Sequence, residues 1–117
     1  MRILSAAVAA ALMLAAVPTL AQEGQYRVQG SNPGGGGSYA GTVTVQKTGQ
    51  TYQVVWQVEG TRFVGTGIGG PDGLAVTYRS GNDTGVAIYV PGQQGGCEGV
   101  WTYAGARQIG QGRWSLR

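Results

Sequence analysis

The sequence has no histidine and only one cysteine, Cys97, among its 117 residues. Histidine is the side chain that most often serves as a general base near neutral pH and as a metal ligand. The five acidic residues are scattered, and none of them has the spacing of a zinc site or an EF-hand loop. The sequence therefore predicts no catalytic residues, no metal site and no cofactor, and the chain is not expected to be an enzyme.

A single cysteine cannot form a disulfide within one chain. Cys97 stands beside Glu98 and close to Trp101, in a stretch that alternates like a strand. We interpret it as a small, partly buried apolar residue, with a reactive or intermolecular thiol as the alternative. Because successive strand residues point to opposite faces, Glu98 is expected to face solvent opposite Trp101.

Charge is also sparse, with eight basic and five acidic residues and a formal net charge of +3. The basic residues stand singly and form no run. A nucleic-acid-binding face needs several Lys or Arg side chains close together to release counterions. Nucleic acid is therefore not an expected partner.

Long hydrophobic runs are absent except at the start of the chain. Arg2 precedes an alanine-rich apolar run over residues 3–17, and the small residues Thr19 and Ala21 follow Pro18. This order is typical of a secretory signal peptide over residues 1–21, cleaved to leave a mature domain over residues 22–117. An uncleaved membrane anchor is the alternative. The protein is expected to be exported, periplasmic or secreted, with no membrane span.

Glycine, in contrast, is abundant: all 23 glycines lie beyond residue 23, between short stretches that alternate apolar and polar residues. Glycine disfavours long helices and favours turns and bulges. About eight strands are predicted, at residues 25–29, 39–47, 51–58, 61–68, 74–78, 86–90, 98–104 and 113–116. The fold class is therefore all-β.

The connections after the second predicted strand are too short for parallel crossovers, so neighbouring strands should pair antiparallel in order. Such a meander leaves two open edges unless it closes. We predict a single small antiparallel up-and-down β-barrel, with a two-sheet β-sandwich as the alternative. The predicted interior residues are Tyr26, Val28, Tyr39, Val43, Val45, Tyr52, Val54, Trp56, Val58, Leu74, Val76, Tyr78, Val86, Ile88, Trp101, Tyr103 and Trp114.

Three stretches of the sequence carry a resemblance to a known family. They are residues 26–33 (YRVQGSNP), residues 39–45 (YAGTVTV) continued by 49–56 (GQTYQVVW), and residues 96–102 (GCEGVWT). In these stretches the chain resembles short exported alphaproteobacterial proteins catalogued as fibronectin-binding proteins. The resemblance implies an exported β domain with a role in adhesion. In architecture the predicted barrel is similar to the small barrels of avidins and lipocalins.

Two classes of binding function remain open. The first is a non-catalytic binding module of the bacterial envelope, whose partner is an extracellular matrix or envelope protein or a small apolar ligand. Tyr39, Trp56, Trp101 and Trp114 would then line the barrel interior or its mouth, although each could simply fill the core. The second is an inhibitor that plugs a protease or lysozyme with the loop at residues 30–38 or 91–96.

Overall fold

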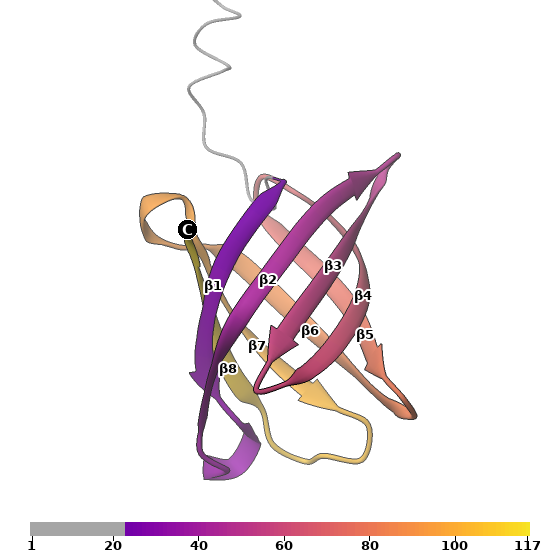
Figure 1. Cartoon of the computed structure of the whole chain (residues 1–117), viewed down its shortest axis with the longest axis vertical. Helices are drawn as coiled ribbons and strands as arrows, with labels where there is room; N and C mark the ends of the chain where they lie inside the picture. Colours follow the sequence, from indigo (N-terminus) through magenta and orange to yellow (C-terminus); the bar gives the residue numbers. More distant parts are fainter. Residues whose placement is uncertain (1–22) are drawn as a thin grey trace, which may run out of the picture.

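Eight strands follow one another along the chain in the computed structural model, which describes residues 23–117 (Figure 1). The predicted signal peptide, residues 1–21, lies outside the described residues. The strands are β1 (Gly24–Ser31), β2 (Ser38–Thr48), β3 (Thr51–Val58), β4 (Thr61–Gly70), β5 (Gly73–Ser80), β6 (Asp83–Pro91), β7 (Cys97–Tyr103) and β8 (Gly110–Leu116). Two single 3-10 turns, η1 (Pro33–Gly35) and η2 (Gln93–Gly95), lie in the loops after β1 and β6. Within residues 23–117 no helix is long and apolar enough to cross a membrane.

Each strand pairs antiparallel with the next, and β8 pairs with β1 to close the barrel. The closing pairs include Val28 with Trp114 and Tyr26 with Leu116. Closure leaves no strand edge free to pair with another chain. The predicted up-and-down barrel is confirmed, and the two-sheet sandwich is wrong.

A tight two-residue turn at Glu59 and Gly60 connects two neighbouring strands. Both residues have positive φ, 51° and 82°, as a type I′ turn requires, and the turn joins β3 to β4. Asn and Gly are the usual residues at such positions, because a larger side chain in the left-handed region is strained. A glutamate at the first position is therefore unusual.

The strands at the closing seam are longer than predicted. The last strand begins at Gly110 instead of residue 113, and its glycines continue the ladder, with Gly112 opposite both Gly30 and Gly99. The prediction assigned these glycines to a loop. They are strand residues whose missing side chains leave room for aromatic rings inside the barrel.

The interior is apolar throughout the described chain: no polar or charged residue is buried. The buried core consists of Tyr26, Val28, Val43, Val45, Val54, Trp56, Leu74, Val76, Ala87, Tyr89, Cys97 and Trp114. Tyr39, Tyr52, Val58, Phe63, Tyr78 and Trp101 pack against it while remaining partly exposed. Most of the predicted interior is therefore confirmed.

The exceptions lie mainly on β6, whose predicted face is wrong. Val86 and Ile88 were expected inside, but they are 43% and 55% exposed on the outer wall, while Ala87 and Tyr89 point inward. Residues on both faces of β6 are apolar, so alternation did not mark the inner one. Tyr103, also expected inside, is 47% exposed and is the last residue of β7.

Candidate ligand-binding site

The two ends of the barrel differ in how their interiors are filled. One end, lower in Figure 1, is bordered by residues 32–37, 59–60, 81–82 and 104–109, which connect successive strands. We call this end the mouth. The other end is bordered by the two chain termini of the barrel and by the remaining turns, and we call it the closed end. A cavity of about 360 Å³ lies inside the mouth.

Aromatic side chains form most of the wall of this cavity. They come from the six strands β2 to β7 and are Tyr39, Trp56, Phe63, Tyr78, Tyr89 and Trp101. The polar lining residues are Asn32, Ser38, Glu59 and Thr61, which belong to the loop, the turn and the strand ends at the rim. The cavity is thus aromatic in its depth and polar at its opening.

Three of the four predicted binding residues line this cavity: Tyr39, Trp56 and Trp101. Trp114 does not. It is 1% exposed and packs in the core against Tyr26, Trp56 and Tyr89, with ring centroids 5.6, 6.1 and 4.4 Å away. The structure therefore divides the predicted set into a mouth group and one buried core residue.

The sequence-based site omitted Phe63, Tyr78 and Tyr89. Tyr78 was expected only as a core residue, and Tyr89 was placed outside by the wrong face of β6. Phe63 is the sole phenylalanine and precedes the glycine-interrupted half of β4. Its position opposite Trp56 in the β3–β4 hairpin was the available signal, because cross-strand partners share a face.

The rings meet edge to face, which holds them at fixed angles around the cavity. Trp56 and Tyr78 have centroids 5.7 Å apart at 62°, and Phe63 and Tyr78 are 5.9 Å apart at 85°. Tyr39 and Trp101 form a further pair, 5.7 Å apart at 79°. Such T-shaped pairs are favoured by the ring quadrupoles. Because neighbouring rings are steeply tilted to one another, the cavity wall presents both ring faces and ring edges.

Glycines on neighbouring strands determine where these rings lie. A Cβ atom at Gly30 would overlap the Tyr39 ring, and one at Gly85 would overlap the Tyr78 ring. At Gly110 it would approach the Trp101 indole to 2.7 Å. Each ring therefore lies flat over backbone that a side chain would otherwise cover. The absence of side chains at these glycines makes the aromatic wall possible.

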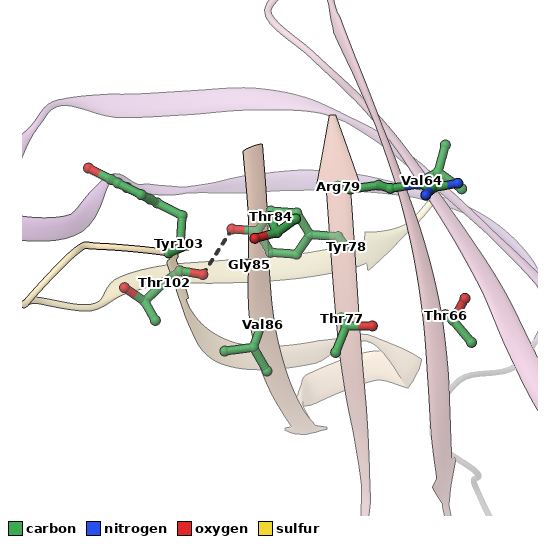
Figure 2. A pocket seen from close by; sticks show the side chains of 11 residues that line it. Val64, Thr66, Thr77, Tyr78, Arg79, Thr84, Gly85, Val86, Thr102 and Tyr103 are labelled. Carbon is green, nitrogen blue, oxygen red and sulfur yellow. Dashed lines mark hydrogen bonds between the residues drawn. The ribbon is translucent and has the colours of Figure 1, made fainter. Parts of the chain in front are cut away.

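The polar ends of the rings are bound to backbone carbonyls. The Tyr39 hydroxyl and Trp101 Nε1 both donate to the Gln111 carbonyl, at 3.1 and 3.3 Å. The Tyr78 hydroxyl donates to the Thr102 carbonyl at 3.0 Å (Figure 2). These bonds anchor the rings and occupy their donors. The rings thus offer the cavity π-faces and apolar edges more than hydrogen bonds.

The mouth tyrosines are held in their neutral form. Burial raises the pKa of Tyr39, and burial together with the nearby Tyr39 and Tyr103 phenols raises the pKa of Tyr78 to about 12. Burial is also the main cause of the raised pKa of Tyr89. No phenolate therefore forms in the cavity near neutral pH.

The mouth loops are ordered by their own hydrogen bonds. The Asn32 backbone N–H donates to the Gly37 carbonyl at 2.8 Å, and Thr102 Oγ1 donates to the Gln108 carbonyl at 2.9 Å. The Gln108 side chain lies where a Cβ atom at Gly34 would be, so the two loops are in contact. A rim that is already folded loses little conformational entropy when a ligand enters.

Two larger hollows lie on the outer wall. One, of about 670 Å³, covers β4 to β7, where Thr66, Thr77, Val86 and Thr102 form a row of cross-strand neighbours (Figure 2). Thr77 is exposed on this outer wall, whereas its neighbour Tyr78 packs against the core. The other, of about 820 Å³, is lined mainly by residues of β1, β2, β7 and β8 and also by Glu59. Neither hollow has the converging rings of the mouth.

Cys97 and Glu98 lie where the sequence placed them. Cys97 is 3% exposed, and burial, assisted by the Glu98 charge, raises its thiol pKa to about 12. The interpretation of Cys97 as a small buried residue is confirmed, and its thiol is protonated and inert near neutral pH. Glu98 is exposed on the outer wall, as predicted.

The two loops considered for an inhibitor lie at opposite ends of the barrel. Residues 32–37 border the mouth, and residues 92–96 border the closed end. A single target could therefore engage only one of them. Over residues 23–117, no three His, Cys, Asp or Glu side chains are grouped as metal ligands.

The mouth cavity is the one place in the described chain where the expected binding residues come together around a space. Its chemistry has to be derived from this chain alone. No protein-family model matches the sequence, and no curated protein matches it significantly.

Proposed function

We propose that this chain is an exported, non-catalytic binding module that takes one small, largely apolar molecule into the mouth of its barrel. The observation that carries the proposal is the set of partly exposed rings around the cavity of about 360 Å³. Binding sites for small molecules have volumes of roughly 300 to 1,000 Å³ and are lined mainly by apolar and aromatic side chains. The mouth satisfies both conditions.

The contrast in exposure supports this use. A protein that needed these rings only for stability would gain by covering them, because burying apolar surface contributes about 25 cal/mol per Å². Tyr39, Phe63 and Trp101 remain partly exposed at the mouth, on a rim whose loops are ordered. A ligand would cover the same surface that the fold leaves open.

The test is saturable binding of phenylnaphthylamine, an uncharged apolar fluorescent probe, by the mature domain. We expect one-to-one binding with energy transfer from tryptophan, and competition between this probe and other small apolar molecules. Val58→Trp places a large side chain at the cavity wall and should abolish binding. Val90→Trp makes the same change on the outer wall, where Val90 is 51% exposed, and should leave binding intact.

Equal binding by both variants would show that the probe does not use the mouth, and the proposal would be wrong. Circular dichroism and the urea midpoint of each variant verify that the barrel is folded. A small-ligand site and a folded barrel are thus tested separately.

A second function, binding to an extracellular matrix or envelope protein, is favoured by a different surface. Ile68, Ala75, Ile88 and Val100 are cross-strand neighbours that form an apolar row on the outer wall. Ile68 and Ile88 are 64% and 55% exposed. If this row binds immobilised fibronectin, Ile88→Lys should reduce capture while Val58→Trp leaves it unchanged.

A further inference from the structure

The charge at the mouth indicates what kind of molecule the cavity accepts. Glu59 is the only charged residue among those that line it, and neither Lys nor Arg is among them. Arg107 belongs to the neighbouring loop at residues 104–109 but does not line the cavity. An anionic ligand would meet a carboxylate and no base, whereas a cation would meet a carboxylate and several aromatic faces.

Glu59 is also held in place at some cost to the backbone. Its φ of 51° lies in the left-handed region, where a long side chain is disfavoured and Asn or Gly would be better. Residues kept in such conformations are found preferentially at functional sites. The strain therefore gives an independent reason to look for a function of this carboxylate.

The carboxylate is oriented but not neutralised. Its Oε2 accepts a hydrogen bond from the Ala40 amide at 3.2 Å, across the β2–β3 hairpin. Its other oxygen has no hydrogen-bond partner and no ion pair within residues 23–117. One oxygen thus fixes the side chain at the rim, and the other remains available to a ligand.

The deeper wall favours a cation that needs no hydrogen bonds. The face of an aromatic ring carries a negative partial charge and attracts ammonium groups within about 6 Å of its centroid. The Tyr39 and Tyr78 hydroxyls and Trp101 Nε1 already donate to backbone carbonyls. The other polar lining residues lie at the rim, so the main further polar group in the depth of the cavity is the hydroxyl of the buried Tyr89. An alkylated ammonium group, which has little or no hydrogen-bonding capacity, matches these conditions.

We infer that the mouth binds a small organic cation, with an alkylated ammonium group against the aromatic wall and Glu59 as its counter-ion at the rim. This inference rests on the proposed small-ligand site and specifies its ligand class. The aromatic faces supply the short-range attraction, and the carboxylate selects for positive charge. The inference makes charge, not apolar area alone, the basis of selection.

The experiment compares two probes of nearly equal shape. Choline carries a trimethylammonium group, and dimethylbutanol replaces that group with an uncharged tert-butyl group. Each is titrated against the mature domain by calorimetry and by displacement of phenylnaphthylamine. We expect choline to bind about tenfold more tightly than dimethylbutanol. We also expect choline affinity to fall as salt is added, because Glu59 lies at the exposed rim.

The variants separate the counter-ion from the fold. Glu59→Gln should lower choline affinity about fivefold and leave phenylnaphthylamine affinity unchanged. Glu59→Asn should lower choline affinity similarly while raising the urea midpoint, because Asn suits the type I′ turn. Glu98→Gln removes an acid from the outer wall and serves as the matched control, with no change expected in either probe.

The outcomes distinguish the inference from the function on which it rests. Dimethylbutanol binding as tightly as choline, or Glu59→Gln behaving like Glu98→Gln, would overturn the cation inference while phenylnaphthylamine binding still supports the site. Failure of phenylnaphthylamine to bind at the mouth would instead reject the small-ligand site itself. Loss of choline binding with a stabilised Glu59→Asn barrel cannot be attributed to unfolding.

Discussion

Both ends of this barrel have apolar interiors, but the side chains fill the two ends differently. Toward the closed end, Val45, Val54, Leu74 and Cys97 are at most 3% exposed, and they fill the interior with aliphatic side chains and a thiol. At the mouth, aromatic rings surround a cavity of about 360 Å³. Both ends are apolar, so hydrophobicity does not distinguish them. What differs is whether the side chains meet one another across the barrel.

Ring size and glycine placement account for the difference. A large ring opposite a glycine lies flat against the wall, as Tyr39 does over Gly30, and leaves the axis open. Branched aliphatic side chains project toward the axis and meet there. Whether a narrow barrel is filled or hollow at a given height therefore depends on which side chains point inward there. The closed end provides stability, and the mouth provides accessible surface.

The largest effect that tests this contrast is expected from the tryptophans. Trp114→Ala removes a side chain that is 1% exposed and should cost about 3–5 kcal/mol of unfolding free energy in urea titrations. Trp101→Ala, at the mouth, should cost about 1–2 kcal/mol because its ring is already partly exposed. Equal costs would mean that the two ends are packed alike.

Trp114→Phe provides the matched control. The Trp114 Nε1 atom is buried without a hydrogen bond of ordinary geometry among residues 23–117, although an interaction with the Tyr89 hydroxyl slightly opposes the rise in that group's pKa. Removing a buried donor that lacks a well-formed hydrogen bond offsets part of the lost packing. Trp114→Phe should therefore be much milder than Trp114→Ala, and phenylnaphthylamine binding should survive it.

The next effect concerns the glycines beneath the mouth rings. At Gly30 an added methyl group would overlap the Gln111 carbonyl as well as the Tyr39 ring. Because backbone cannot move aside easily, Gly30→Ala should cost about 2–3 kcal/mol. At Gly112 the nearest atom is the Tyr39 hydroxyl oxygen, at 3.0 Å, so Gly112→Ala should cost less than about 1 kcal/mol.

Urea unfolding measures both costs, and probe binding shows whether the mouth changes. Gly112→Ala should shift the Tyr39 ring slightly and weaken phenylnaphthylamine binding while the barrel remains stable. If Gly30→Ala were as mild as Gly112→Ala, the rings would not depend on close approach to the backbone.

A smaller effect is expected from titration, and it reports on both ends. The pKa of Cys97, near the closed end, rises from 9.0 to about 12, and that of Tyr78, at the mouth, rises from 10.0 to about 12. Both groups are neutral when protonated, and folding favours that form. Their contributions are therefore fully present below the unfolded pKa and are lost as pH rises toward 12.

Stability should thus begin to fall above pH 9 through Cys97 and further above pH 10 through Tyr78. Urea midpoints at increasing pH measure the loss, and ultraviolet absorbance separates thiolate from phenolate. Cys97→Ala should remove the first part and Tyr78→Phe the second. Stability that stayed constant up to pH 11 would contradict the burial of both groups.

The closed barrel could be predicted from the sequence because turn glycines and alternation agree along most of the chain. The prediction was wrong where a local pattern had two meanings. Val86, Ile88 and Val90 are as apolar as their inward neighbours on β6, so only pairing with β5 and β7 determines the face. Gly110 and Gly112 resembled loop residues because the sequence around them does not show why glycine is needed there. The aromatic rings that lie over them, Trp101 and Tyr39, come from other strands.

The sequence predicted the aromatic character of the candidate site, but it did not determine which aromatic residues would line it. Tyr39, Trp56 and Trp101 were expected as binding residues, and they meet at the mouth because strand tilt and register bring residues from β2, β3 and β7 to one level. Trp114 looks the same in sequence, yet the pairing of β8 with β1 places it in the core. Which aromatic residue remains accessible depends on how each strand is aligned with its neighbours. The residue pattern within one strand does not specify that alignment.

The smallest predicted effect concerns the rim of the closed end, where the chain supplies its own cation. Lys47 Nζ lies 5.9 Å from the centroid of Tyr52, its cross-strand neighbour. No Lys or Arg lines the mouth cavity, where Glu59 contributes the charge.

Lys47→Met keeps the apolar stem and should cost about 0.5 kcal/mol, the value of an exposed cation–π contact. A urea titration of this variant beside Tyr52→Leu and the double variant would measure the coupling. A coupling near zero would weaken the idea that rings at the rim of this barrel attract cations, whereas a clear coupling at the closed end would support the cation binding proposed for the mouth.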